Sequence, residues 1–238
     1  MNEAAARFDV PLYSVADAAR HIKVPRATFD TWARGYERRV DGRPPTRGRP
    51  IVTALDAPRG HPRIPFIGLA EAYVLAGIRR AGVPLQRIRP AVDELEAKLG
   101  IAHVLASRAL YTDGAEVLYD YAEAHGDTPE ARAARELVVV RNQQRVFRDV
   151  IDDYLRRIDF SGDGWAGALH LPQYRGADVV IDPARSFGLP IFARGAAQVE
   201  VVLGRFKAGE SATSIENEFG VPPDQLIDAV RVHLDTAA

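Results

Sequence analysis

The sequence predicts an α+β protein that begins with a winged helix-turn-helix and ends with a three-helix unit of helix-turn-helix type. Three observations lead to this prediction. Apolar residues recur at helical spacing around a short turn within 13–34, an arginine-rich stretch at 34–63 is interrupted by Pro and Gly, and short apolar runs alternate with helical patterns after residue 100. We therefore expect three segments, a winged helix-turn-helix domain at 1–100, a small mixed α+β segment at 101–182 and a helical domain at 183–238.

The charges are divided unevenly along the 238 residues, although the formal net charge is only −1. Residues 1–90 hold 16 Lys and Arg against 8 Asp and Glu, whereas residues 91–238 hold 15 against 24. A basic first part is typical of nucleic-acid contact and an acidic remainder suits another kind of partner, unless the charges are distributed by chance. The absence of cysteine excludes disulfides and thiolate metal sites. With no signal peptide and no apolar run of membrane-spanning length, we expect a cytoplasmic protein without a membrane partner.

Two short helices are expected within residues 13–34. Ser14 and Asp17 have the spacing of a capping box, so the first helix begins there. Its apolar stripe consists of Val15, Ala18, Ala19 and Ile22. Val24 can plug the turn, and Pro25 suits the start of a second helix that runs to Arg34. Phe29, Trp32 and Ala33 form the inward side of that second helix.

The outward side of the second helix has the side chains of a major-groove reader. Arg can bind guanine through two hydrogen bonds, and Thr can contact a base edge or the thymine methyl group. We predict that base contacts come from Arg26, Thr28, Thr31 and Arg34. We predict that phosphate contacts come from Arg43, Arg47 and Arg49 in the stretch that follows. The alternative is a helical hairpin that touches no DNA.

The stretch 34–63 is interpreted as a wing that lies along the phosphates. It carries eight arginines against three acids, and its Pro and Gly residues prevent a long helix. Ile51, Val52 and Leu55 are expected to form a short strand. A flexible, solvated linker is the alternative interpretation.

Two further helices are expected after Pro65. Leu69, Tyr73 and Ala76 line the first, and Gly82 ends it. The inward residues of the second are Ile88, Val92, Leu95 and Leu99. The order of reading helix, basic wing and helix pair over residues 10–100 resembles the winged helix-turn-helix of MerR-like regulators. The resemblance implies a homodimer, formed through the second helix, and a palindromic DNA site.

The middle segment is predicted to be a small α+β region. Asp113-Gly114 suits a tight hairpin between two strands within 104–121, LVVV at 137–140 suits a third strand, and 146–158 has the pattern of an amphipathic helix. ALHL and DVVID, at 168–171 and 178–182, are two more expected strands. The arginines at 141–157 are either a solvated face with internal ion pairs or a surface for an acidic partner.

No catalytic, cofactor or metal site is predicted. Residues 162–167 match G-x-G-x-x-G, but they follow a predicted helix and precede a predicted strand, which is the wrong context for a dinucleotide. The acids Asp149, Asp152 and Asp153 have no histidine nearby, so we exclude a metal there. Walker, HExxH and GxSxG motifs are absent. The sequence therefore does not indicate an enzyme.

The last segment is expected to form three helices. Val199, Val202, Leu203 and Phe206 line the first, Ser211–Phe219 forms the second, and the third begins at Pro222-Pro223 with Leu226, Ile227, Val230 and Leu234 facing inward. Residues 209–238 hold six acids against Arg231, a balance that favours a protein partner over DNA.

Residues 178–234 resemble a small helical domain found in bacterial antitoxins. The matching motifs are Ile181-Asp182-Pro183, Gly188-x-Pro190 and Gly209-Glu210-Ser211. The family continues with G-T-R-I-P after its G-x-P turn, whereas this chain has Arg194-Gly195-Ala196-Ala197-Gln198. No role can be carried over to that stretch.

With the MerR-like domain, the chain as a whole resembles a large VapB-type antitoxin. The resemblance implies that it neutralises a PIN-domain ribonuclease toxin by binding it and represses the shared operon through operator DNA. It does not identify the residues that inhibit the toxin. The alternatives are a stand-alone MerR-like regulator that holds a small effector within 101–182 and an enzyme in the middle segment, for which clustered His and carboxylates are missing.

Overall fold

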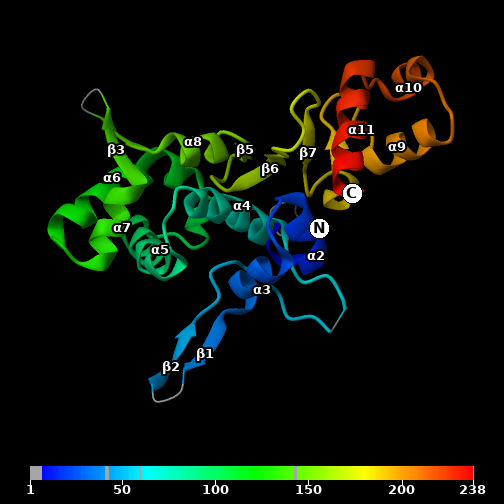
Figure 1. The fold of residues 1–238 in the computed structure, drawn as a ribbon. Helices are drawn as coiled ribbons and strands as arrows, with labels where there is room; N and C mark the ends of the chain where they lie inside the picture. The colour runs from blue at the N-terminus through cyan, green and yellow to red at the C-terminus, as the bar shows by residue number, and fades with distance from the viewer. Residues whose placement is uncertain (1–6, 41–42, 59, 142–143, 238) are drawn as a thin grey trace. The chain divides into compact units, whose positions relative to one another are not determined.

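The structure is a computed structural model that describes residues 7–40, 43–58, 60–141 and 144–237 (Figure 1). The chain divides into two compact units, Met1–Ala166 and Gly167–Ala238. The elements of the first unit are α2 (Val15–His21), α3 (Arg26–Arg34), β1 (Tyr36–Val40), β2 (Arg43–Gly48), α4 (Phe66–Arg80), α5 (Leu85–Leu99), η1 (Val104–Ala106), α6 (Arg108–Ala124), α7 (Pro129–Leu137), β3 (Val138–Arg141), β4 (Gln144–Phe147), α8 (Asp149–Leu155) and β5 (Ile158–Phe160). After β6 (Ala166–His170), the second unit contains β7 (Val179–Ile181), η2 (Ser186–Gly188), β8 (Ile191–Phe192), α9 (Val199–Lys207), α10 (Ala212–Phe219) and α11 (Pro223–Ala237).

Helix α4 is the central element of the first unit, because every residue from Phe66 to Ile78 is buried. A helix that is apolar on all sides must be enclosed by its neighbours. Helix α8 packs against it, with the rings of Tyr73 and Tyr154 4.6 Å apart. The inward positions predicted for this helix, Leu69, Tyr73 and Ala76, are confirmed as buried.

Helix α5 packs against α6 and α7 of the same chain. Its predicted inward residues Ile88, Val92 and Leu95 are buried, and Leu99 is partly exposed. This apolar face is therefore covered within one chain. In the MerR-like arrangement, a second copy of the chain would cover it instead.

The hairpin expected within 104–121 is wrong, because Val104–Ala106 form η1 and residues 108–121 lie in the single helix α6. The Ser107 hydroxyl caps the helix by accepting a hydrogen bond from the Leu110 N–H at 3.2 Å. Leu110, Gly114, Leu118 and Ala122 then recur every fourth residue and are all buried. Gly114 is a packing position, since a Cβ there would lie 2.8 Å from Leu110 Cδ1 and 3.1 Å from Phe147 Cζ. The Asp113-Gly114 pair therefore does not form a turn. The glycine is needed because a larger residue would collide with the neighbouring side chains.

The strand expected at 137–140 is present as β3, which pairs antiparallel with β4 from Val138–Phe147 to Arg141–Gln144. The helix expected at 146–158 is shorter than predicted, because its first two residues belong to β4 and α8 spans only Asp149–Leu155. The glycine-containing loop before β6 is structural. Its Asp163 forms an ion pair with the buried Arg7, and Trp165 Nε1 donates to the Ala102 carbonyl at 3.2 Å.

In the second unit, β7 pairs antiparallel with both β6 and β8, and α9 contacts α10 and α11. The strands expected at 168–171 and 178–182 correspond to β6 and β7. The inward face predicted for α11 is partly wrong. Leu226 is fully buried, but Ile227 and Leu234 are 47% and 61% exposed, because the buried side of this helix follows Leu226 and Ala229. Among the described residues, no helix is long and apolar enough to cross a membrane.

Candidate nucleic-acid interface

The first two helices form a helix-turn-helix held by local capping and an aromatic core. The Ser14 hydroxyl accepts from the Asp17 N–H at 3.1 Å and caps α2. In the turn, Lys23 has a left-handed φ of 55°. Phe29 and Trp32 of α3 are 0% and 3% exposed, which fixes the rotation of α3 about its axis. As predicted from the apolar spacing, the remaining face of α3 points outward.

The four residues predicted to contact bases lie on α3, with the side chains of Arg26 and Arg34 exposed and those of Thr28 and Thr31 partly exposed. Two of them already have partners. Arg34 Nε donates to Asp30 Oδ1 at 2.6 Å, and the Thr31 hydroxyl donates to the Ala27 carbonyl at 2.9 Å. Asp30 therefore orients Arg34 along the helix, and Thr31 keeps its methyl group and oxygen lone pairs for other contacts.

The basic stretch after α3 forms an antiparallel hairpin of β1 and β2, with Tyr36 opposite Gly48 and Glu37 opposite Arg47. Gly35 starts it with φ 77°, and a Cβ there would lie 2.2 Å from the Gly48 carbonyl oxygen, so only glycine fits. The strand expected at Ile51, Val52 and Leu55 is wrong. Their segment caps α3 instead, because the N–H groups of Ile51 and Val52 both donate to the Trp32 carbonyl, at 2.9 and 3.2 Å.

Two of the three arginines predicted to contact phosphates are paired with carboxylates. Arg47 Nε lies 3.0 Å from Glu37 Oε2 across the hairpin, and Arg49 forms an ion pair with Asp93 of α5. Arg43 lies in β2, but its side chain is outside the described residues. The pairs are exposed and therefore weak. A phosphate can replace each carboxylate, or bind the same guanidinium beside it, at a small cost in free energy.

The hairpin is connected to the core by Arg89 of α5. Its guanidinium lies 5.4 Å from the centre of the Tyr36 ring, and its Nε donates to the Arg49 carbonyl at 3.0 Å. Because α5 itself is packed on α6 and α7, the base of the hairpin cannot shift freely relative to α3. These two contacts therefore connect the base of the hairpin to the packed helices of the first unit.

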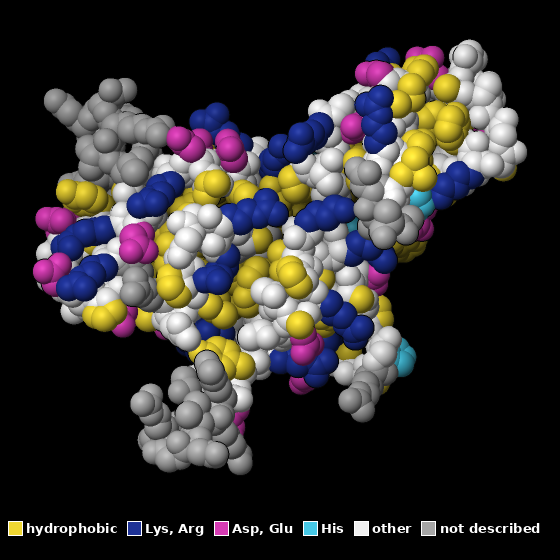
Figure 2. Space-filling view, in the orientation of Figure 1, with side chains coloured by type: hydrophobic (Ala, Val, Ile, Leu, Met, Phe, Trp, Pro, Cys, Tyr) yellow, Lys and Arg dark blue, Asp and Glu magenta, His cyan; other side chains and the backbone are white. Residues whose placement is uncertain are grey.

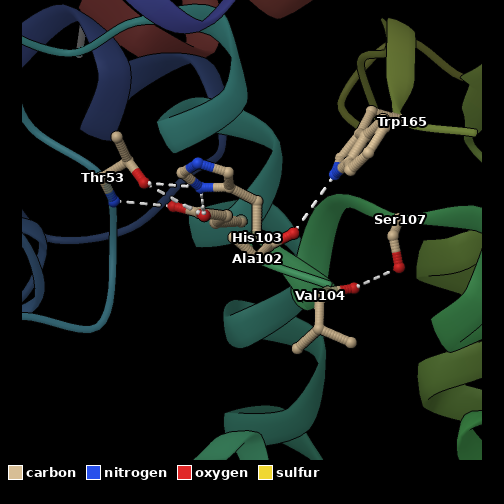
Figure 3. Close-up of polar contacts among 7 residues, drawn as sticks. Thr53, Ala102, His103, Val104, Ser107 and Trp165 are labelled. Atoms are coloured by element: carbon tan, nitrogen blue, oxygen red, sulfur yellow. Dashed lines mark hydrogen bonds and ion pairs between the residues drawn. The ribbon is translucent and has the colours of Figure 1, made fainter. Parts of the chain in front are cut away.

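A partly buried polar cluster ties the segment after the hairpin to α4 (Figure 3). Glu71 is 4% exposed and accepts from the Thr53 N–H at 2.6 Å and from the Thr53 hydroxyl at 3.1 Å. His103 Nδ1 lies 2.8 Å from Glu71 Oε1. This hydrogen bond raises the pKa of His103, whereas burial opposes the shift. The stabilisation from the charged His103 is therefore present at low pH and lost as the pH rises through this raised pKa.

A cavity of about 400 Å³ lies beside this cluster. Its lining includes Ala33 at the end of α3, Arg49 at the base of the hairpin, and Glu71, Arg89 and His103. The cavity thus touches both elements that carry predicted DNA contacts. Most of its lining lies outside residues 101–182, the segment in which a stand-alone regulator was expected to hold a small effector.

The acidic partners of the interface arginines were not predicted from the sequence. The Asp30–Arg34 pair has the i, i+4 spacing of a helical ion pair and was recognisable once the helix was predicted. Glu37 and Arg47 are brought together only by the hairpin register, and Asp93 and Glu71 only by helix packing. No local pattern marks those contacts.

Comparisons with known proteins agree with a DNA-binding domain at this end of the chain. Residues 11–92 match the family described as "Putative DNA-binding HTH domain". The "Putative antitoxin VapB45" of Mycobacterium tuberculosis is 50% identical over 226 residues, which cover 94% of each protein. The "Uncharacterized protein Rv2308" of the same organism is 26% identical over 228 residues, covering 94% of this chain and 90% of that protein.

A solved structure is similar along nearly the whole chain. The crystal structure of Rv2018 from Mycobacterium tuberculosis matches with a TM-score of 0.82 and 47% identity, covering 94% of this chain and 99% of that one. The similarity of sequence and fold therefore extends through both units and well beyond the helix-turn-helix. Because the chain is 50% identical to the "Putative antitoxin VapB45" over 94% of both proteins, it belongs to the family of VapB45, and its residues 11–92 belong to a helix-turn-helix family.

Proposed function

We propose that this protein is the antitoxin of a type II toxin-antitoxin system, which binds and neutralises a PIN-domain ribonuclease and represses its own operon. The observation that carries the proposal is the outward face of α3, with Arg26, Thr31 and Arg34, beside a basic hairpin in a chain that is 50% identical to the "Putative antitoxin VapB45". The division into a DNA-binding segment at 1–100, a middle segment at 101–182 and a protein-binding segment at 183–238 is part of this proposal.

In the proposed complex with operator DNA, α3 enters the major groove. Arg26, Thr28, Thr31 and Arg34 contact base edges, while Arg43, Arg47 and Arg49 bind phosphates and set the register. Arg34 is the strongest candidate for guanine recognition, because Asp30 restrains its guanidinium before DNA arrives. The short hairpin suits the backbone beside the groove, since its exposed Arg47 can exchange the Glu37 carboxylate for a phosphate.

We further propose a homodimer on a palindromic operator, by analogy with the MerR-like arrangement. The apolar face of α5 is already covered by α6 and α7, so the dimer contact uses another surface. The spacing of the operator half-sites would then differ from that of MerR-like regulators. Footprinting on the promoter measures this spacing directly.

The decisive experiment is co-expression of the chain with the product of the adjacent reading frame, followed by affinity purification. We expect a second, smaller protein that shows no ribonuclease activity until it is separated from this chain. A single protein with no partner would contradict the antitoxin function. Promoter binding is measured separately by fluorescence anisotropy at several salt concentrations. The affinity of a protein for DNA depends steeply on salt, so a value at one unstated concentration cannot be interpreted.

A second candidate function is a stand-alone regulator with a small-molecule effector. The cavity beside Glu71 and His103 supports it, because a ligand there would touch both the end of α3 and the base of the hairpin. This function requires a chain that purifies without a nuclease and still binds its promoter. The co-expression experiment therefore separates the two candidates.

A further inference from the structure

The C-terminal helices α10 and α11 repeat the helix-turn-helix of α2 and α3 with a constant offset of 197 residues. Ser211 caps α10 by accepting from the Ser214 N–H at 3.1 Å, the same contact and distance as Ser14 with Asp17 in α2. The turn residue Gly220 has a left-handed φ of 67°, and its counterpart is Lys23. In both turns the sequence continues with Val and Pro.

The buried positions of the two motifs also correspond. Phe29 and Leu226 are both 0% exposed at the fourth position after that proline. Ala18 and Ile215, at equivalent positions of α2 and α10, are also both 0% exposed. The side-chain sizes differ, but the pattern of burial and capping is the same. Helix α11 is therefore placed within its motif as α3 is within its own.

The outward residues of the two helices differ in chemistry. At equivalent positions, α3 has Ala27, Asp30 and Arg34, while α11 has Asp224, Ile227 and Arg231. One turn further along α11, Leu234 continues the same side. Residues 209–238 hold six acids, and Arg231 is their only Lys or Arg. This composition repels a phosphate backbone, so α11 is not a second DNA reader.

Part of the surface of α11 is already occupied within its own unit. Asp228 stands where α3 has Thr31, and its Oδ2 accepts from the N–H groups of Gly176 and Ala177, both at 2.9 Å. The loop before β7 therefore covers one side of α11. The equivalent side of α3 carries Thr31, a predicted base contact. The side with Ile227 and Leu234 is left exposed.

Exposed apolar residues concentrate in the second unit. Of the seven large hydrophobic side chains exposed among the described residues, five belong to it, including Val201, Ile227 and Leu234. Figure 2 shows hydrophobic atoms at the surface of the lobe formed by α9, α10 and α11. Exposed apolar side chains with an arginine among them are typical of protein interfaces.

We propose that the α11 face, defined as Asp224, Ile227, Arg231 and Leu234, is the docking surface for the nuclease partner and covers its basic RNA-binding groove. A nuclease that binds a polyanion presents positive charge along that groove, and the net negative charge of residues 209–238, with Asp224 on the α11 face, is complementary to it. Ile227 and Leu234 supply the apolar contact at the centre. The proposal rests on the proposed antitoxin function and adds the surface and mode of inhibition.

The test uses the full chain co-expressed with the adjacent gene product. The variant I227S/L234S removes the apolar centre, and Y111S/V150S is the matched control, since Tyr111 and Val150 are 42% and 38% exposed in the first unit. We expect wild type and control to co-purify with the partner, and the partner to show no ribonuclease activity in that complex. We expect I227S/L234S to lose recovery by at least about tenfold while its circular dichroism and promoter binding stay unchanged.

A second measurement tests whether the α11 face covers the RNA-binding groove of the nuclease. A single-stranded RNA oligonucleotide, bound to the separated nuclease in the absence of divalent metal, should compete with this chain for the nuclease. Lack of competition at saturating RNA would overturn the groove assignment. Recovery of the partner by I227S/L234S at wild-type level would overturn the docking surface and leave the antitoxin function standing.

Two other outcomes also overturn the proposal. If wild type recovers no partner, the antitoxin function fails and the docking surface fails with it. If I227S/L234S keeps the partner but changes the mass of the isolated chain in light scattering, the α11 face belongs to a second copy of this chain.

Discussion

The two helix-turn-helix motifs share a backbone pattern and differ in what surrounds their second helix. Helix α3 is followed by a basic hairpin, and its outward side carries Arg and Thr residues. Helix α11 is the last element described, and a loop of its own unit binds its Asp228. Caps, turn and buried residues specify the motif in both places, and we propose that a few outward residues decide what each motif binds.

The core of each motif provides the strongest test of this comparison. Phe29→Ala should lower the free energy of unfolding of the first unit by about 3–5 kcal/mol, and Leu226→Ala that of the second by about 2–5 kcal/mol, because each leaves a cavity at a fully buried position. Urea denaturation measures both. We expect Phe29→Ala to abolish promoter binding and keep partner recovery, and Leu226→Ala to do the reverse. Loss of both activities in both variants would show that the motifs are not independent.

A histidine at the end of α2 makes the first motif sensitive to acid. Burial, with Arg20 nearby, lowers the pKa of His21 to about 4. The unfolded chain takes up this proton near pH 6.5, so the first unit should lose stability as the pH falls from 6.5 toward 4, approaching about 3 kcal/mol. The equivalent residue of the second motif is Glu218, exposed and paired with Arg205. Denaturation midpoints at pH 7 and 4.5 should differ less in His21→Gln than in wild type; an equal difference would contradict this origin.

Arg34 and Arg231 occupy equivalent positions and offer a direct exchange test. Arg34→Ala should weaken operator binding by about 1–3 kcal/mol, roughly 5- to 150-fold, and relax the preference at one base pair. Arg231→Ala should leave operator affinity unchanged and weaken partner recovery. Anisotropy titrations with the operator and its single-base variants measure the first effect. Equal losses of operator affinity in both variants would assign DNA binding to both motifs.

The variant Asp30→Asn separates two effects of Asp30 on DNA binding, which are the orientation of Arg34 and the negative charge of Asp30 itself. Asp30→Asn removes the ion pair with Arg34 and one negative charge facing the proposed DNA. Affinity for any duplex should rise by a few fold, roughly the effect of one screened charge, while the ratio of operator to random affinity should fall because Arg34 is less restrained. A fall in affinity for random DNA would show that Asp30 does not oppose the phosphates.

The smallest expected effect concerns the hairpin. Arg47→Ala should reduce affinity for all sequences equally and lower the slope of log affinity against log salt by about one unit. Arg194→Ala is the control, because Arg194 is an exposed arginine of the second unit. An unchanged slope in Arg47→Ala would remove this residue from the phosphate contacts.

Local sequence signals predicted the elements that depend on neighbouring residues. The Ser14 cap, the apolar spacing of α2 and α3, and the buried sides of α4 and α5 were readable because each lies within one or two helical turns. The hairpin within 104–121 was a wrong prediction for a tertiary reason, since Gly114 serves the contact with Phe147. Ile51 and Val52 were also misjudged, because their N–H groups cap α3 instead of pairing in a strand.

By itself, the sequence determined where the first capped helix-turn-helix begins and that a basic part precedes an acidic one, because capping, periodicity and charge are properties of short stretches. Only the tertiary structure decided which carboxylates hold Arg47 and Arg49, that α6 and α7 cover α5, and that α11 exposes Ile227. These features depend on side chains brought together from distant positions or on burial that only packing sets. No periodicity along the chain records them.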